Sequence, residues 1–219
     1  MTTTNGNAGA RPGAKKIVFD WAGVLFRWHP ENMLKREIPH IANTDAAAAH
    51  WRHEIFQAYG GDWGEFDRGT VAAPDLVQRI ARRTGLPAAD IQRVVDRVPL
   101  ELQPIADTVR WLAELRGQGR TLFFLSNMPE PYAAHLEREH AFIGWFAAGI
   151  ISARVHHIKP EPGIFTLAAE RFGAADPGEL VFLDDHLPNV ESARSLGWNA
   201  VQFFDAAQAA HELAERGWL

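Results

Sequence analysis

The 219-residue sequence contains no cysteine, and this absence removes several classes of protein from consideration. Disulfide scaffolds, thiolate metal centres and cysteine nucleophiles all need a residue that the chain does not have. No apolar run approaches the roughly 18 residues that indicate a membrane-spanning helix. There are 22 lysines and arginines against 27 aspartates and glutamates, and with a net charge of −5 we expect no nucleic-acid partner.

The first 14 residues also lack an apolar stretch. They consist mainly of Thr, Asn, Gly and Ala, whereas a secretory signal needs an apolar segment. We therefore expect residues 1–14 to form a disordered tail. By elimination, the sequence favours a cytoplasmic enzyme, monomeric or homodimeric, without a membrane or nucleic-acid partner.

What the sequence does contain is a set of four short apolar runs that each end in a polar, chemically competent residue. The runs and their polar ends are Ile17–Phe19 with Asp20, Leu122–Leu125 with Ser126 and Asn127, Val155–Ile158 with Lys159, and Leu180–Leu183 with Asp184 and Asp185. Such runs are typical of strands buried on both faces of a parallel sheet. Ligands bind such sheets at the carboxyl ends of the strands. We expect the polar ends to meet there and to suit a cation and a phosphate.

The segment after the first run has helical spacing instead. Apolar stripes recur at intervals of three and four residues, at Leu76, Val77, Ile80 and Ala81 and again at Ile91, Val94, Val95 and Val98. From residue 104 onward, helices and strands alternate, which favours a parallel sheet with right-handed crossovers. The predicted fold is α/β: a Rossmann-like core of residues 15–29 and 100–219, with a small all-helical cap of residues 30–99 inserted after the first strand.

Each motif alone is common, but their order and spacing are specific. Asp20, Ser126, Lys159 and the pair at residues 184–185 resemble the four motifs of the haloacid dehalogenase-like hydrolase superfamily. The resemblance covers about residues 15–205, and the helical insertion lies where that family carries its small cap. The segment Phe66–Val71 resembles an acidic-x-Gly turn in the caps of one branch. That branch includes sugar-phosphate phosphatases and the N-terminal phosphatase domain of soluble epoxide hydrolases.

The resemblance implies a Mg²⁺-dependent phosphatase that acts on a small phosphorylated metabolite. It implies that Asp20 attacks phosphorus and forms an aspartyl phosphate. Mg²⁺ is expected on Asp20, on the carbonyl of Ala22 and on Asp185. Asp184 is expected either beside the metal or paired with Lys159.

The resemblance also implies a set of phosphate and substrate contacts. Ser126 and the amide of Asn127 are expected to hold phosphate oxygens, and Lys159 to balance the charge of the nucleophile and of the phosphoryl group. Trp21 directly follows the nucleophile and is expected to border the site. Trp63 precedes the turn of the cap and is expected to line a substrate pocket, although packing in the core explains it equally well.

The residue two positions beyond the nucleophile departs from the family pattern. Most phosphatases of the superfamily carry a second aspartate there, which protonates the leaving group, whereas this chain carries Ala22. General acid–base catalysis contributes about 10²–10⁴-fold to a rate. His186 is a candidate substitute, because imidazole transfers protons near neutral pH, and the alternative is an exposed loop histidine. Some members of the resembling branch also carry a small residue there and are described as phosphatases.

Three functions therefore remain open. The first is a phosphatase that uses another acid, or none, on esters with good leaving groups. The second is a metal-independent 2-haloacid dehalogenase, in which Asp20 attacks carbon. The segment Ala22–Val24 and the pair at residues 184–185 both differ from the pattern of family dehalogenases, which disfavours this function. The third is a non-catalytic protein that binds a phosphorylated ligand or a partner. The chain keeps all the site residues other than the second aspartate, which disfavours this function.

Overall fold

The computed structural model describes residues 15–219, so the predicted tail of residues 1–14 lies outside the described residues. Five strands form one parallel sheet in the order β3-β2-β1-β4-β5. The strands are β1 (Lys16–Phe19), β2 (Leu122–Ser126), β3 (Ala148–Ile151), β4 (Leu180–Asp184) and β5 (Asn199–Gln202). The prediction of an α/β fold with a parallel sheet is confirmed.

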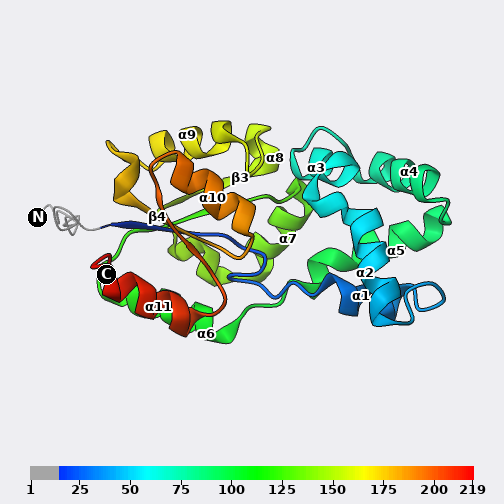
Figure 1. Ribbon diagram of the computed structural model, residues 1–219, viewed down its shortest axis with the longest axis horizontal. Helices are drawn as coiled ribbons and strands as arrows, with labels where there is room; N and C mark the ends of the chain where they lie inside the picture. The colour runs from blue at the N-terminus through cyan, green and yellow to red at the C-terminus, as the bar shows by residue number, and fades with distance from the viewer. Residues whose placement is uncertain (1–14) are drawn as a thin grey trace, which may run out of the picture.

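Helices cover both faces of the sheet (Figure 1). They are α6 (Ala106–Gly117), α7 (Glu130–Glu139), α9 (Pro162–Arg171), α10 (Leu187–Ser195) and α11 (Ala206–Glu215). Ile17 and Phe19 share one apolar cluster with α6, α7 and α11, while Val18 shares another with α9 and α10. Successive side chains of a strand point to opposite faces. The run Ile17–Phe19 is therefore continuously apolar because each face of β1 needs its own buried side chains.

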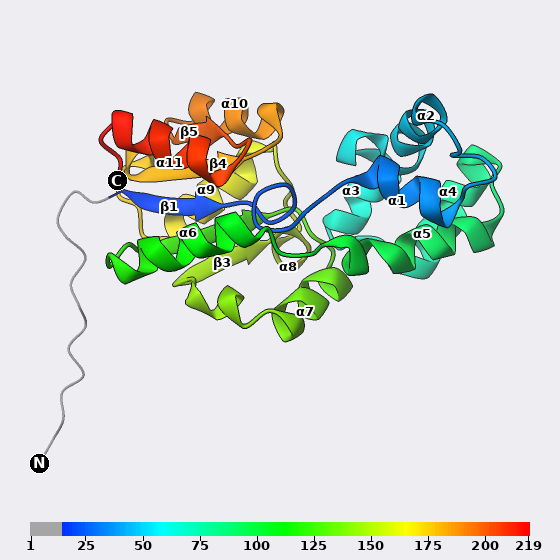
Figure 2. The ribbon, with the colours of Figure 1, turned by 90° about the horizontal axis from the view of Figure 1, so that it is seen from below.

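A second lobe consists of helices that follow β1 in the sequence (Figure 2). They are α1 (Pro30–Glu37), α2 (Asp45–Phe56), α3 (Gly61–Asp67), α4 (Ala73–Thr84) and α5 (Ala88–Glu101). The Thr44 hydroxyl caps α2 by accepting the Ala47 N–H at 3.1 Å. Gly85 ends α4 at φ +73°, a conformation that glycine adopts without strain. The domain boundaries at residues 30 and 99 stay a prediction.

Four short helical segments complete the described chain: η1 (Gln57–Tyr59), η2 (Ala141–Trp145), α8 (Ser152–Val155) and η3 (Pro177–Glu179). The prediction of a strand at Val155–Ile158 is wrong. Instead β3 and α8 precede a loop in which His156 has a φ of +57°. This run contains two histidines, and the His156 ring contacts the carbonyl of Arg68 at 3.0 Å. A strand buried on both faces needs apolar side chains on both sides, and a histidine ring that contacts a main-chain carbonyl does not meet this need.

The two connections between the lobes run side by side. The Arg27 N–H donates to the Gln103 carbonyl at 2.8 Å, and the Ile105 N–H donates to the Leu25 carbonyl at 2.8 Å. The chain therefore leaves the sheet lobe and returns to it at neighbouring points. None of the helices in residues 15–219 has the length and apolar character needed to cross a membrane.

Candidate active site

The candidate site lies where the order of the strands reverses. The chain continues from β1 to β2 and β3 on one side of the sheet, and then to β4 and β5 on the other. Open α/β sheets bind ligands in the crevice at such a point. Asp20 follows β1, Asp184 is the last residue of β4 and Asp185 comes next. The sheet topology alone thus brings these carboxylates together.

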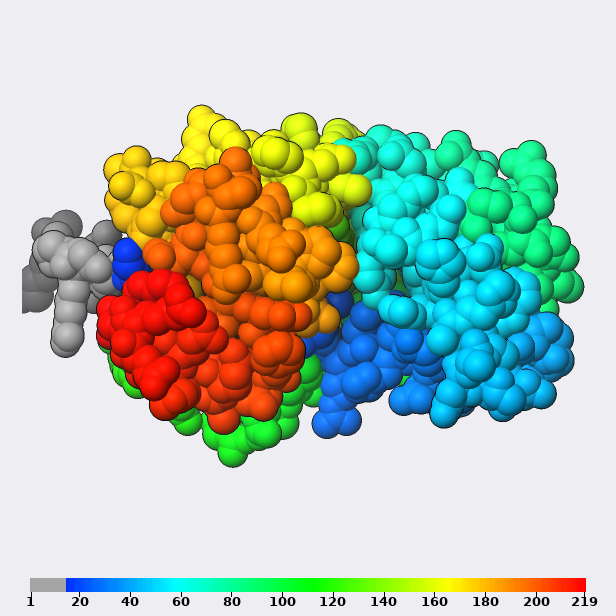
Figure 3. Space-filling view, viewed as in Figure 1, coloured from blue at the N-terminus to red at the C-terminus, as the bar shows by residue number. Residues whose placement is uncertain are grey.

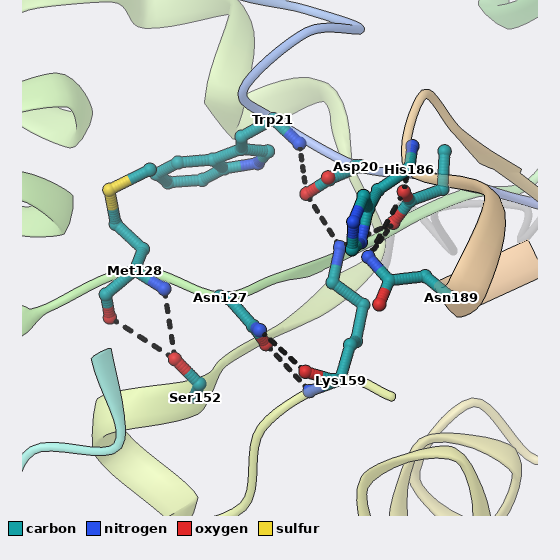
Figure 4. Close-up of polar contacts among 9 residues, drawn as sticks. Asp20, Trp21, Asn127, Met128, Ser152, Lys159, His186 and Asn189 are labelled. Carbon is teal, nitrogen blue, oxygen red and sulfur yellow. Dashed lines mark hydrogen bonds and ion pairs between the residues drawn. The ribbon is translucent and has the colours of Figure 1, made fainter. Parts of the chain in front are cut away.

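Lys159 is the cation at the centre of this group (Figure 4). Its ammonium lies 2.9 Å from Oδ1 of Asp20 and 2.6 Å from Oδ2 of Asp184. The Lys159 side chain is only 1% exposed. Asp184 also accepts the His186 N–H at 2.8 Å, and the amide of Asn189 lies 3.1 and 3.0 Å from its two oxygens. Both carboxylate oxygens of Asp184 are therefore engaged with protein donors.

The charges of the group do not balance, because three carboxylates surround one ammonium. Burial raises the pKa of Asp20, and Asp184 and Asp185 raise it further, against the opposing effect of Lys159. Removal from water and the charge of Asp184 raise the pKa of Asp185 to about 6. Burial disfavours the charged ammonium, but the two carboxylates outweigh it and raise the pKa of Lys159. An additional cation would restore the balance and keep Asp20 ionised.

The oxygen donors fit Mg²⁺. Asp20, Asp184 and Asp185 each offer an oxygen, and these atoms lie within 4.8 Å of one another. Gly23 makes room for one of them: a Cβ at this residue would lie 2.3 Å from Cγ of Asp185. Hard oxygen ligands in a small cluster are those that Mg²⁺ prefers. Since Asp184 is already engaged, Asp20 and Asp185 are the side chains best able to face a metal.

The two residues at the end of β2 have different surroundings. The Ser126 hydroxyl is buried and has no hydrogen-bond partner among the described residues. The Asn127 side chain accepts the Lys159 N–H at 2.8 Å and donates to the Lys159 carbonyl at 2.9 Å. It thus fixes the backbone of the loop that carries Lys159. The main-chain N–H of Asn127 has no partner within residues 15–219 and is available to a ligand.

The two tryptophans named from the sequence contribute in different ways. The Trp21 ring is fully buried and packs against Phe26 and Phe124, with ring centroids 5.9 and 4.8 Å away. Its main-chain N–H, however, donates to Oδ1 of Asp20 at 2.7 Å. Trp63 is also buried, and its ring forms part of a small apolar pocket. The core and pocket interpretations of Trp63 are therefore compatible.

A cavity of about 410 Å³ lies between the two lobes, which meet along the seam visible in Figure 3. The sheet lobe contributes Asp20, Lys159 and Asp185 to its wall. A smaller apolar pocket of about 50 Å³ has wall residues in common with it. The shared residues are Ala22, Trp28, Tyr59, Asp67 and Asn127, and the smaller pocket adds Trp63, Val98, Leu102, Met128, Pro129 and Tyr132.

Sequence reasoning missed several residues of this wall. Trp28 and Tyr59, whose side chains are joined by a 2.8 Å hydrogen bond, carry no recognisable motif. Asp67 does lie in the predicted acidic-x-Gly turn, and that turn was the available signal. His186, which the sequence analysis did name as a candidate acid, lines the cavity just before α10, next to Asp185.

Comparison with known proteins agrees with this geometry. The sesquiterpene phosphatase astK of Aspergillus oryzae is 26% identical over 92% of this chain and 95% of its own length. The drimenol cyclase drtB of Aspergillus calidoustus is 27% identical over 93% of this chain, but the match spans only 38% of that longer protein.

Solved structures share the fold. A Bacteroides thetaiotaomicron enzyme of the same family, in complex with magnesium and inorganic phosphate, has a TM-score of 0.66 at 22% identity, covering 86% of this chain and 93% of its own. The family model described as haloacid dehalogenase-like hydrolase matches residues 14–197. The chain therefore belongs to the haloacid dehalogenase-like hydrolases.

Proposed function

We propose that the protein is a Mg²⁺-dependent phosphomonoesterase in which Asp20 forms an aspartyl phosphate. The observation that carries the proposal is the position of Asp20. Its carboxylate lies at the point where the strand order reverses, 2.9 Å from the Lys159 ammonium. One of its oxygens lies within 4.8 Å of an Asp185 oxygen, so that the two could bind the same metal ion. An anionic nucleophile can approach an anionic phosphate only where cations compensate the charge of both.

The residues divide the work between attack and charge compensation. Asp20 attacks phosphorus, and Lys159 compensates the charge of the nucleophile and of the phosphoryl oxygens. Asp184 keeps Lys159 in place rather than binding metal, since its own oxygens are engaged. Asp20, Asp185 and the carbonyl of Ala22 would hold Mg²⁺, which would supply further positive charge at the phosphate.

The phosphate oxygens need donors on the other side of the site. The Ser126 hydroxyl and the main-chain N–H of Asn127 are both without a protein partner in the described part of the chain. A buried hydroxyl without a partner is costly, and a phosphate oxygen would remove that cost. We assign the two groups to phosphate binding on this basis.

The walls of the cavity support a substrate with an apolar alcohol. Trp28 and Tyr59 lie between the phosphate site and the small pocket, where Trp63, Val98 and Met128 continue the apolar surface. A cavity of about 410 Å³ has the size of a small-molecule site. The name of the Aspergillus oryzae relative, a sesquiterpene phosphatase, agrees with this substrate class. We propose a phosphate monoester of a small, largely apolar alcohol.

The test is a panel of phosphate esters, measured with Mg²⁺ and with a chelator. It includes terpenyl, short-chain alkyl, sugar and p-nitrophenyl phosphates, and Asp20→Asn serves as the blank. We expect Mg²⁺-dependent release of phosphate, fastest from the apolar esters, and none from the blank. The absence of Mg²⁺-dependent phosphate release from every ester would contradict the phosphatase assignment.

Two further measurements on the wild-type protein test the alternative functions, a dehalogenase and a non-catalytic binding protein. Halide released from 2-haloacids without metal identifies a dehalogenase. A rise in melting temperature with a phosphorylated compound that is never turned over identifies a binding protein.

A further inference from the structure

Hydrolysis of an alkyl phosphate leaves a strongly basic alkoxide, which needs a proton donor. Ala22 has no titratable group, so the donor has to come from elsewhere in the cavity. The titratable groups that line the cavity and its apolar pocket are Asp20, Arg52, Tyr59, Asp67, Tyr132, Lys159, Glu161, Asp185 and His186. Asp20 and Asp185 are already assigned to attack and to metal binding.

Most of the remaining groups are unsuitable as proton donors. Lys159 is held between two carboxylates. Glu161 is kept ionised by the guanidinium of Arg68, which holds its pKa below its usual range. Burial raises the pKa of Tyr59 and of Tyr132 above the ordinary value near 10, so both phenols are weak acids at neutral pH. An arginine, such as Arg52, does not give up its proton in a protein. Two groups are left.

These two groups, Asp67 and His186, differ in position. His186 lines only the larger cavity and follows Asp185, on the side of the proposed metal. Asp67 lines both the larger cavity and the apolar pocket, and so do Ala22 and Trp28. The apolar pocket is where an apolar alcohol would lie. Asp67 is thus on the side of the leaving group, in the space left open by Ala22.

The Asp67 carboxyl is buried and unpaired in the described part of the chain. The residue is 4% exposed, and within residues 15–219 its carboxyl oxygens make no hydrogen bond or ion pair, while its main-chain carbonyl does. Burial raises the pKa of Asp67 well above its usual value, and the charge of Asp20 adds to this against the opposing charge of Lys159. A buried carboxyl in these surroundings favours its protonated form more than an exposed carboxyl does.

The backbone of this residue is held firmly against the sheet lobe. The Ser152 hydroxyl donates to the Asp67 carbonyl at 2.5 Å and accepts the Met128 N–H at 2.8 Å. The next residue, Arg68, makes two hydrogen bonds to Glu161, at 2.5 and 2.9 Å. The end of α3 is thus fixed on the loop that carries Lys159. The backbone that carries the Asp67 carboxyl is therefore held in place beside the cavity.

We propose that Asp67 is the proton donor for the leaving group, so that the helical lobe supplies the acid that the β1 loop lacks. This inference rests on the proposed phosphatase function. As Asp20 attacks, the bond from phosphorus to the ester oxygen breaks, and that oxygen takes the proton of Asp67. The alcohol leaves, and Asp67 is now a carboxylate. It then accepts a proton from the water that attacks the aspartyl phosphate, which releases inorganic phosphate and restores both residues.

The test compares Asp67→Asn with the wild type on an alkyl phosphate and on p-nitrophenyl phosphate, whose leaving group needs no proton. Two variants serve for comparison. Asp62→Asn makes the same change on the same helix, at a residue paired with Arg83 outside the cavity. His186→Asn removes the competing candidate. We expect Asp67→Asn to lower kcat/KM about 10²–10⁴-fold on the alkyl ester. The effect of Asp67→Asn on kcat/KM for the p-nitrophenyl ester should be small. Asp62→Asn should have the kcat/KM of the wild type on both esters.

A second readout follows the covalent intermediate. The Asp67→Asn variant has no base to activate water. Its phosphorylated form, with the phosphate on Asp20, should therefore accumulate with p-nitrophenyl phosphate and be visible by mass spectrometry of the intact protein. Equal losses on both esters, or no loss, overturn the inference, and a selective loss in His186→Asn transfers the role to that residue. Wild-type protein that hydrolyses neither ester overturns the proposed function itself. That failure is distinguishable, because it does not depend on any variant.

Discussion

Ala22 and Asp67 show how single residues divide a catalytic task between two lobes. Both line the cavity and its apolar pocket, one as a methyl group from the loop after β1 and the other as a buried carboxyl from α3. A methyl at residue 22 removes one source of protons. It also keeps a further negative charge away from the cluster in which three carboxylates already share one ammonium. The cost of a second acid close to Asp20 is thereby avoided.

The two positions should therefore substitute for each other. Ala22→Asp introduced into Asp67→Asn should recover at least about tenfold of the lost kcat/KM on an alkyl phosphate, because a carboxyl again faces the leaving group. In the wild type, the same substitution should change this value by less than about tenfold, since an acid is already present. Steady-state kinetics of the four proteins test this. Additive effects of the two substitutions would contradict it.

Asp185 gives a prediction about the metal. Mg²⁺ at about a hundred times its dissociation constant should stabilise the wild type by about 2.7 kcal/mol. For a chain of this size that corresponds to a melting temperature roughly 5–10 °C higher. Asp185→Asn should lose most of this rise, because it removes a carboxylate oxygen assigned to the metal. Asp62→Asn should keep it in full. Thermal melts with and without Mg²⁺ decide, and an unchanged rise in Asp185→Asn would refute the assignment.

Most of the site residues that were predictable lie at the ends of strands, whereas Lys159 was predicted although its run forms no strand. Asp20, Ser126 and the pair at residues 184–185 come directly at the ends of buried runs, and strand ends meet at one edge of a parallel sheet. Asp67 was not predicted as a site residue. Its place depends on a hydrogen bond with Ser152, 85 residues away in the sequence. No local pattern encodes a contact of that kind.

Among the elements, the end of α3 is one of the contacts that join the helical lobe to the sheet lobe. Arg68 bonds to Glu161 and also donates to the carbonyl of His156 at 3.2 Å. Gly69 has a φ of +78°, and a Cβ there would lie 2.7 Å from the carbonyl oxygen of Ala153. A glycine is therefore needed for this close approach. The acidic-x-Gly turn is thus a docking element as well as the carrier of Asp67.

Glu161→Gln should weaken this contact in a pH-dependent way. Arg68 lowers the pKa of Glu161 below its ordinary value of 4.5, so the unfolded chain binds more protons than the folded chain near pH 4. The stabilisation of the folded chain by the ion pair is complete above pH 4.5. It is lost as the pH falls through the lowered pKa of Glu161. Because the Glu161 side chain is 42% exposed, we expect at most about 1 kcal/mol at pH 7.

The measurement is thermal unfolding of both proteins between pH 7 and pH 3.5. The melting temperatures should differ at pH 7 and converge at the acid end. Arg68→Gln should give a difference at least as large at pH 7, because Arg68 also bonds to the His156 carbonyl. Adding Glu161→Gln to it should change little further. A difference that persists unchanged below the lowered pKa would show that the ion pair is not its source.

The secondary structure was predictable where the chemistry of the residues was uniform. The runs that became β1, β2 and β4 are apolar throughout, whereas Val155–Ile158 contains two histidines and forms the end of α8 and a loop. The stripes of α4 and α5 are buried as their spacing predicted. How these helices face the sheet lobe was not predictable, because it depends on side-chain contacts between segments far apart in sequence.

At the scale of the whole molecule, the active site is a product of both lobes. The sheet lobe carries the groups proposed for attack on phosphorus, and the helical lobe and its connection carry the wall proposed for the alcohol. Apart from Asp67, the residues proposed for the chemistry and those proposed for substrate choice are different, so mutations should affect the two separately. The cytoplasmic location and the monomeric or dimeric state stay predictions from the sequence.

Trp28 tests this separation, because it lies in the connection and lines both parts of the cavity. Trp28→Ala should raise the KM for a terpenyl phosphate about tenfold or more, since burial of one large apolar side chain contributes about 1.5–3 kcal/mol. The KM for a sugar phosphate should change little. Trp218→Ala, near the end of the chain and outside the cavity, is the control. Equal changes for both esters would contradict an apolar subsite.

The paired connections have a consequence for how such a protein can change. Leu25 and Arg27 are hydrogen-bonded to Ile105 and Gln103, so the entry and exit of the helical lobe are adjacent. Everything between them can be exchanged as one cassette without altering the order or register of the strands. New substrate ranges can thus be acquired by replacing a module. The groups proposed for attack and phosphate binding stay in the sheet lobe, and the new module has to supply a proton donor in place of Asp67.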